Sequence, residues 1–96
     1  MEATYYFTVP SDMNTPDMST FVVDFLRGLM RTKKKLNLYT EREEALFATK
    51  LENPKILIMK INDKSLFSHA QVYSEEQNFI CQGSEAYFKN ECEVWE

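Results

Sequence analysis

Glutamates are the residues of this sequence whose number and spacing best suit chemistry. They form closely spaced sets at Glu75 and Glu76, at Glu41, Glu43 and Glu44, and at Glu91 and Glu93. General acid–base catalysis needs two carboxyl groups in different environments, one of them with a raised pKa. Glu91 and Glu93 would share one face of a strand and could form such a pair. We favour the simpler interpretation that they are the outward side of an edge strand, where acids oppose aggregation.

Cysteine and metal chemistry have a weaker basis. A thiolate nucleophile needs a nearby imidazole, and Cys81, Cys92 and His69 supply the residue types without a spacing that predicts contact. The sequence has no Cys-x-x-Cys, so it lacks the pattern of a structural zinc site. With two glycines it also lacks a phosphate-binding glycine loop. We therefore expect no metal, no cofactor and reduced, buried thiols, with a disulfide between neighbouring strands as the open alternative.

One basic cluster, Arg-Thr-Lys-Lys-Lys at residues 31–35, could contact phosphate groups. It lacks interleaved aromatic residues and belongs to a chain of net charge −4, whereas nucleic-acid-binding domains usually carry a basic surface. We interpret it as the solvated end of a helix, where cations are favourable beside the negative pole of the helix dipole. Direct nucleic-acid binding is not expected, and a phosphate or RNA binder is the third hypothesis.

Acidic and aromatic residues gather in the last third of the chain. Residues 65–96 contain six glutamates and one lysine, whereas residues 1–35 are nearly balanced in charge. Neighbouring strand residues point to opposite faces, so one member of the Tyr87–Phe88 pair should be exposed. Exposed aromatic residues beside acids are typical of interfaces with basic partners, and a covered second sheet face is the equally weighted alternative. The candidate partner-binding residues are Glu85, Tyr87, Glu91, Glu93, Trp95 and Glu96.

The periodicity of the chain predicts the elements that must position these residues. Strands are expected at residues 5–9, 36–39 and 56–61, and the last should be covered on both faces because it is almost wholly apolar. An apolar stripe at helical spacing predicts a helix after an N-cap at Thr15. The stripe consists of Met18, Phe21, Val22, Phe25, Leu26, Leu29 and Met30. Gly28 lies off the stripe and costs helix propensity.

A second helix is predicted at about residues 41–52. Thr40 and Glu43 match a capping box, and Asn53-Pro54 would end the helix. Its buried side would consist of Phe47, Ala48 and Leu51. Short strands should follow at 70–73, 78–82, 86–89 and 92–95, separated by turn-forming residues.

These elements predict a single α+β domain over residues 1–96. Two helices would pack on a mixed or antiparallel sheet of about five to seven strands, in the order β-α-β-α-β followed by a meander of short strands. We expect both helices in one layer with the sheet beneath. No 20-residue window is free of charge, so no membrane span is expected. The first residues lack the pattern of a signal peptide, and we expect a cytoplasmic protein.

Residues 38–45 and 56–61 have a strand–Thr–helix–strand order. This order resembles the middle of ADP-ribosyltransferase-type folds. The resemblance implies a small transferase that uses Glu85 or Glu91, or another glutamate-dependent enzyme, as the alternative function. It does not extend to the first strand, Tyr5-Tyr6-Phe7-Thr8, which lacks the His-Gly-Thr or arginine with which such enzymes hold NAD.

The preferred hypothesis is a non-enzymatic protein-binding module. Its acidic, aromatic C-terminal sheet would dock on a basic protein surface, such as the nucleic-acid-binding face of a protein that it inhibits, as viral or mobile-element anti-defence proteins do. Self-association into a homodimer through a sheet edge is a variant. A pocket of roughly 300 Å³ or more with a carboxylate at its base would instead favour the enzyme, and a flat or convex acidic sheet the binding module.

Overall fold

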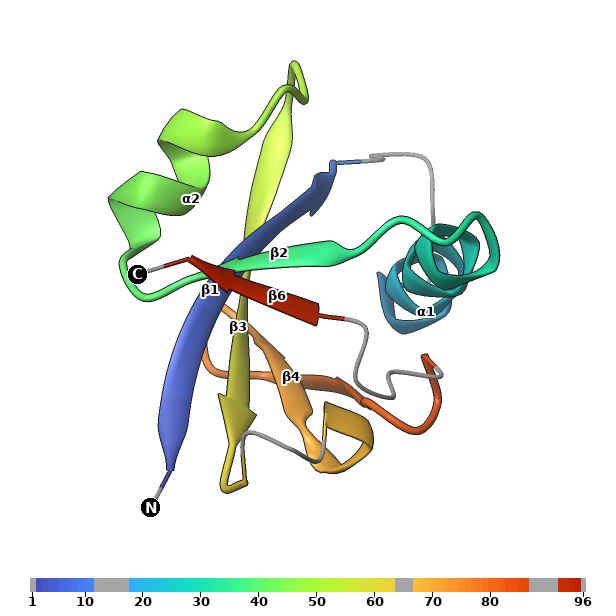
Figure 1. Ribbon diagram of the computed structural model, residues 1–96. Helices are drawn as coiled ribbons and strands as arrows, with labels where there is room; N and C mark the ends of the chain where they lie inside the picture. The colour runs from blue at the N-terminus through green and yellow to red at the C-terminus, as the bar shows by residue number, and fades with distance from the viewer. Residues whose placement is uncertain (1, 12–17, 64–66, 87–91, 96) are drawn as a thin grey trace.

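A six-stranded sheet with the strand order β5-β4-β3-β1-β2-β6 forms the centre of the molecule (Figure 1). The computed structural model describes residues 2–11, 18–63, 67–86 and 92–95, and of residues 18, 19, 30, 93 and 95 it describes the backbone only. In chain order the elements are β1 (Ala3–Pro10), α1 (Met18–Arg31), β2 (Leu36–Tyr39), α2 (Arg42–Ala48), β3 (Pro54–Ile61), the 3-10 helix η1 (Phe67–His69), β4 (Gln71–Ser74), β5 (Phe79–Gln82) and β6 (Cys92–Trp95).

Neighbouring strands are antiparallel except at one edge of the sheet, where β6 runs parallel to β2. The longest pair joins β1 and β3, from Ala3 opposite Ile61 to Pro10 opposite Pro54. From β3 the chain continues through β4 and β5 as an antiparallel meander. These findings confirm the predicted α+β class and the strand number. The last strand leaves the predicted meander, because β6 returns to the edge opposite β5.

The main core lies on the face of the sheet that α1 covers. Tyr5, Phe7 and Val9 alternate along β1 and are almost completely buried, as the two-residue period of a strand requires. Val22 and Leu26 of α1 pack into the same cluster, and Phe21, Phe25 and Leu29 are half-buried at its border. The apolar stripe of the first helix is therefore confirmed for every member whose side chain is described.

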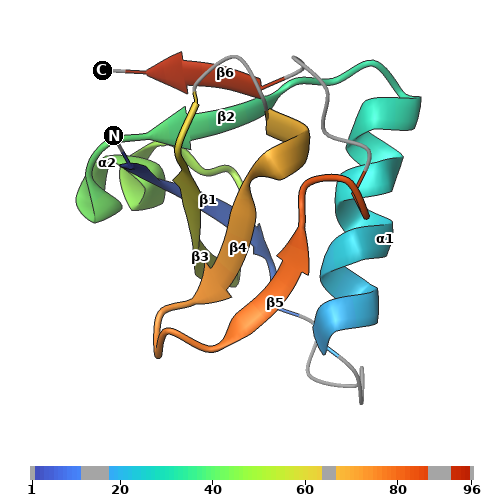
Figure 2. The same ribbon diagram turned by 90° about the horizontal axis from the view of Figure 1, so that it is seen from below.

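The opposite face of the sheet is covered by α2. Ile56 and Ile58 alternate with the core residues of β3 and are also buried. Thr8 points to the same side and donates a hydrogen bond to the Thr49 hydroxyl, with 3.0 Å between the two oxygens. The prediction of both helices in one layer was wrong: the uninterrupted apolar run of β3 needs cover on both faces, and each face receives one helix. The views in Figures 1 and 2 show the helices apart, with strands between them.

Helix α2 is shorter than expected and presents a different side to the sheet. It spans seven residues, and its N-cap, Glu41, makes no side-chain capping hydrogen bond, so the predicted capping box was wrong. Ala45 is buried, whereas Phe47 is 92% exposed and Ala48 is exposed, against the predicted burial of both. The helix ends at Ala48 because Thr49 is extended, so Phe47 and Leu51 never share a helical face. A small alanine on the inner side lets the short helix lie close to the sheet.

The two glycines differ in their burial and in the space beside their Cα atoms. Gly28 is exposed on α1, and a Cβ atom there would meet nothing within 4 Å. Gly83 is buried beside η1, where a Cβ atom would overlap the carbonyl oxygen of Phe67. Its N–H donates to the carbonyl of Ala70 at 2.8 Å. Gly83 therefore permits a close approach of two backbones.

Two further predictions fall wholly or mostly outside the described residues. The predicted N-cap Thr15 and most of the predicted strand 86–89 lie outside the described residues, and Ala86 itself is in a turn. No helix among the described residues is long and apolar enough to cross a membrane.

Candidate functional site

The predicted partner-binding residues divide into three groups. Tyr87, Glu91 and Glu96 lie outside the described residues. Glu93 and Trp95 belong to the edge strand β6, where their backbones lie opposite Asn37 and Tyr39 of β2. Glu85 is exposed in the turn that follows β5.

Glu85 is engaged in hydrogen bonds that hold its turn. Its carboxylate accepts from the N–H of Gln82 at 2.6 Å, and its own N–H donates to the Gln82 carbonyl at 3.0 Å. The carbonyl of Glu85 accepts a hydrogen bond from Nε of Arg27 at 2.9 Å, which ties the turn to α1. Glu85 therefore lies on the α1 side of the sheet and has a structural role whether or not it contacts a partner.

The thiol of Cys81 lies in the core beside this turn. Burial first, and the charge of Glu85 second, raise its pKa to about 11. Because the thiolate is the nucleophilic form, such a thiol is almost unreactive at neutral pH. Cys81 and Cys92 are not joined in a disulfide, and they occupy strands at opposite edges of the sheet. His69 is exposed in η1, and the described residues contain no group of His, Cys, Asp and Glu that could hold a metal ion.

Exposed acids gather around α2. Glu41, Glu43 and Glu44 are exposed at the start of the helix, and the exposed ring of Phe47 follows on its last turn. Trp95 of β6 lies opposite Tyr39, the last residue of β2. The chain enters α2 at Arg42, so β6 ends close to the acidic start of this helix (Figure 1). Two separate parts of the sequence therefore bring acids and aromatic residues to the same end of the molecule.

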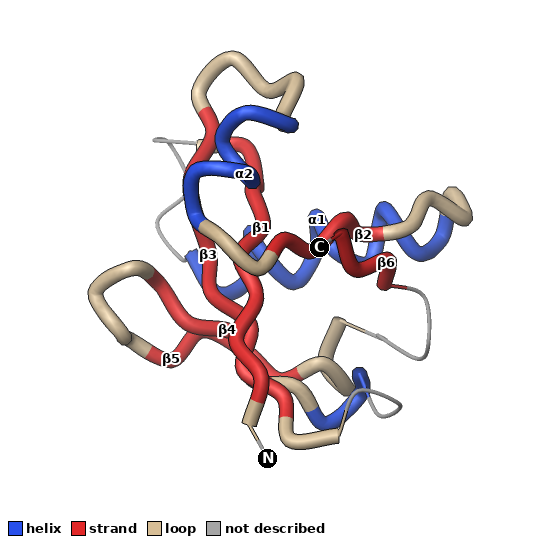
Figure 3. The backbone as a smooth tube through the Cα atoms, turned by 60° about the vertical axis from the view of Figure 1, so that its left-hand side comes forward, coloured by secondary structure: helices blue, strands red, loops and turns tan. Residues whose placement is uncertain are grey.

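The turn between β4 and β5 adds two more acids to this region. Nε of Arg42 donates to Oε2 of Glu75 at 2.6 Å, and this pairing raises the pKa of the Arg42 guanidinium. Hydrogen bonds from its own backbone N–H and from the Ser74 hydroxyl, with the nearby charge of Lys55, lower the pKa of the exposed Glu76. The Arg42–Glu75 pair holds the β4–β5 turn beside the start of α2, and Figure 3 shows α2 and the β4–β5 hairpin next to β3. We call this region the acidic surface: Glu41, Glu43, Glu44, Phe47, Glu75 and Glu76.

Phe47 differs from the other exposed aromatic residue, Phe79. The ring of Phe79 is 54% exposed and makes an edge-to-face contact with Tyr73, with 5.8 Å between the centroids. The Lys60 ammonium in turn lies 4.9 Å from the centroid of Tyr73. Phe47 makes no ring or cation contact within the described part of the chain. Phe47 is therefore the most exposed large apolar side chain in the described part of the chain.

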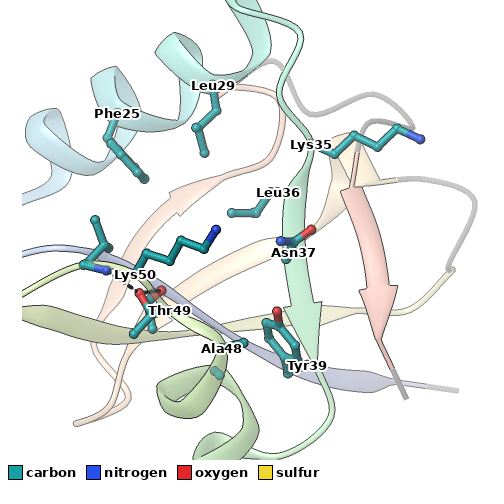
Figure 4. Close-up of a pocket in the computed structure, with 12 residues that line it drawn as sticks. Phe25, Leu29, Lys35, Leu36, Asn37, Tyr39, Ala48, Thr49 and Lys50 are labelled. Atoms are coloured by element: carbon teal, nitrogen blue, oxygen red, sulfur yellow. Dashed lines mark hydrogen bonds between the residues drawn. The ribbon is translucent and has the colours of Figure 1, made fainter.

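A pocket of about 380 Å³ lies where β1 and β2 diverge, between α1 and α2 (Figure 4). The lining residues are Thr8, Phe25, Leu29, Lys35, Leu36, Asn37, Tyr39, Ala45, Ala48, Thr49, Lys50 and Leu51. Its volume reaches the roughly 300 Å³ typical of small-molecule sites. None of the lining residues carries a carboxylate, so the pocket does not provide the base expected of a glutamate-dependent enzyme.

No protein-family model, curated protein or solved structure matches this chain significantly.

Two features of the site do not follow from the sequence pattern. The predicted longer helix buries Phe47, although Glu43 and Glu44, one turn before it, suggest a solvated face. The pattern gives Lys50 no special place, since one lysine after a helix is an ordinary surface residue. Its place in the pocket depends on the end of α2 at Ala48, which the sequence pattern did not predict.

Proposed function

We propose that this protein is a non-enzymatic binding module whose acidic surface docks on a basic protein partner. The observation that carries the proposal is the exposure of Phe47, at 92%, on the helix that also presents Glu43 and Glu44 to solvent. Burying a phenylalanine side chain on binding contributes about 1.5–3 kcal/mol. Carboxylates around it would speed association with a basic surface and select against acidic ones.

The residues predicted from the sequence would extend this surface. Glu93 and Trp95 lie on β6, whose end is close to the start of α2. Tyr87, Glu91 and Glu96 are proposed contacts as well. Glu85 is also proposed, but it lies on the side of the sheet that α1 covers and would contact the partner apart from the acidic surface.

The proposed partner is a protein that uses a basic surface to bind nucleic acid, and the module would inhibit it by occupying that surface. Proteins bind the phosphate backbone through lysine and arginine side chains. The five glutamates of the acidic surface are exposed, and one of them, Glu75, is already paired with Arg42. Glu76 accepts hydrogen bonds from its own N–H and from the Ser74 hydroxyl near Lys55, which leaves Glu41, Glu43 and Glu44 for such cations.

The proposal is tested by affinity capture from the native host, followed by mass spectrometry and a direct affinity measurement with the captured protein. The test variants are Phe47→Ser and the double substitution E43Q/E44Q, and the matched control is K33Q/K34Q, which changes two exposed charges after α1. We expect a captured protein with a basic surface, and at least tenfold weaker binding for each test variant. The control should bind as the wild type does. Unchanged affinity in both test variants would refute the acidic surface as the docking site.

The contribution of β6 needs a separate variant. Replacing Trp95 by Ala together with E91Q and E93Q should abolish capture while the circular dichroism spectrum stays that of the folded protein. Capture at wild-type affinity by this triple variant, with loss in Phe47→Ser, would confine the interface to α2 and the β4–β5 turn.

A further inference from the structure

The pocket between α1 and α2 has a lining of apolar and polar side chains. Leu36 and Ala45 are buried, and Phe25, Leu29 and Leu51 are half-buried. Asn37 and Lys50 are exposed. A cavity with apolar walls and a few polar groups is the usual form of a small-molecule site.

The polar groups come together on one side of the cavity. Figure 4 shows the Lys50 side chain reaching across the pocket toward Leu36, between α1 and β2. The Asn37 amide and the Tyr39 hydroxyl lie on the strand that it faces. The Lys35 side chain leaves the rim and points away. One ammonium, one amide and one hydroxyl therefore border the same space beside an apolar wall.

One positive charge borders this space. Of the two lysines in the lining only Lys50 reaches into the pocket, and no lining residue carries a carboxylate. No salt bridge or hydrogen bond joins Lys50 to any residue of the described ranges. The neighbouring polar pair Thr8 and Thr49 is already satisfied, since the two hydroxyls hydrogen-bond to each other at 3.0 Å. An anionic group is the complement that the pocket lacks.

We propose that this pocket binds a small organic acid with an apolar body and a single carboxylate. The carboxylate accepts hydrogen bonds from the Lys50 ammonium and from the Asn37 amide or Tyr39 hydroxyl. The apolar body lies against Phe25, Leu29 and Leu36. Neither part suffices by itself: an inorganic anion leaves the apolar walls unfilled, and an uncharged or cationic amphiphile leaves Lys50 without a partner. This site is independent of the acidic surface, which α2 presents on its exposed side.

The experiment is a titration of the full chain, labelled with ¹⁵N, with octanoate, octylammonium and inorganic phosphate, each at the same ionic strength. We expect saturable octanoate binding that shifts the amide signals of β2 and of residues 49–51. Octylammonium and inorganic phosphate should bind at least tenfold more weakly. Equal binding of octylammonium, equal binding of phosphate, or no saturable octanoate binding up to millimolar concentration would overturn the proposal.

Two variants and a matched control locate the site. K50Q removes the cation and should weaken octanoate binding at least fivefold. Ala48→Phe fills the pocket from an exposed position of α2 and should weaken it at least tenfold. K34Q removes an exposed lysine that does not line the pocket and should leave the affinity unchanged. Each variant must first give the dispersed spectrum of a folded chain. Wild-type affinity in both K50Q and Ala48→Phe, or an equal loss in K34Q, would show that octanoate binds elsewhere.

Discussion

Replacing each of the two glycines by alanine should change stability in opposite directions. The chemical change is the same at both positions, so the loss of conformational freedom in the unfolded chain is nearly the same as well. The difference between Gly28→Ala and Gly83→Ala therefore reports on the folded structure alone. It tests whether α1 is exposed to solvent at residue 28 and whether the turn after β5 packs closely against η1.

Gly28→Ala should stabilise the protein. The position is exposed, lies within α1 and has no atom within 4 Å of the added methyl group. Alanine exceeds glycine in helix propensity by about 1 kcal/mol. The carbonyl of Gly28 accepts hydrogen bonds from the Thr32 N–H at 3.1 Å and the Thr32 hydroxyl at 2.9 Å, and neither depends on a side chain at position 28. A gain of about 1 kcal/mol raises the melting temperature by roughly 4 °C or more in a domain of this size.

Gly83→Ala should destabilise it. The added methyl group would overlap the carbonyl oxygen of Phe67, which is backbone and cannot rotate away. Relieving such overpacking costs about 1–3 kcal/mol. Separating the two segments would also weaken the bond from the Gly83 N–H to Ala70, which contributes about 1 kcal/mol. We expect a net loss of at least about 2 kcal/mol and thus a difference of about 3 kcal/mol between the two variants.

Urea denaturation followed by circular dichroism measures both variants against the wild type, with the slope of the transition as the check that unfolding remains two-state. A neutral Gly83→Ala would refute the close approach of the turn to η1. A destabilising Gly28→Ala would show that α1 is covered at that position.

Three further predictions concern single residues. Cys81→Ala should remove a pH dependence of stability. The pKa of the Cys81 thiol is raised to about 11 in the folded state, so the thiol ionises more readily in the unfolded chain, and the wild type loses stability as the pH rises from about 9 to 11. Urea titrations from pH 7 to 11 measure it, and an equal decline in both proteins would contradict the assignment. Tyr5→Phe should raise the free energy of unfolding by about 1 kcal/mol, because the buried hydroxyl has no hydrogen-bond partner among the described residues; a lower melting temperature would reveal a partner. Lys33→Gly should stabilise the end of α1 by about 0.5–1 kcal/mol, because Lys33 has a φ of 60°, where glycine is favoured. An unchanged urea midpoint would show that the backbone of Lys33 is not strained.

The parts of the fold that could be predicted depend on patterns within one element. The alternation in β1 and the helical stripe of α1 each place their own residues on a buried face, and both are confirmed. The apolar run of β3 correctly indicated cover on both faces. The pairing of β6 with β2 depends on contacts between residues more than fifty positions apart, and nothing local in β6 selects β2 over β5 as its neighbour. The face of the sheet on which each helix packs depends equally on distant residues. An apolar stripe shows that one side of a helix is covered, but it does not show which face of the sheet covers it.

Helix α2 shows why the candidate site was the hardest part to predict. Its one buried side chain is Ala45, which offers little apolar area. Two further contacts lie at the ends of the helix: the Arg42–Glu75 pair, and the hydrogen bond between Thr8 and Thr49, the residue after the helix. The residues of these two contacts are 33 and 41 positions apart in the sequence, so neither contact forms a local sequence pattern. A helix placed in this way does not need Phe47 for its own stability. That ring makes no aromatic or cation contact among the described residues, and the proposed interface is centred on it.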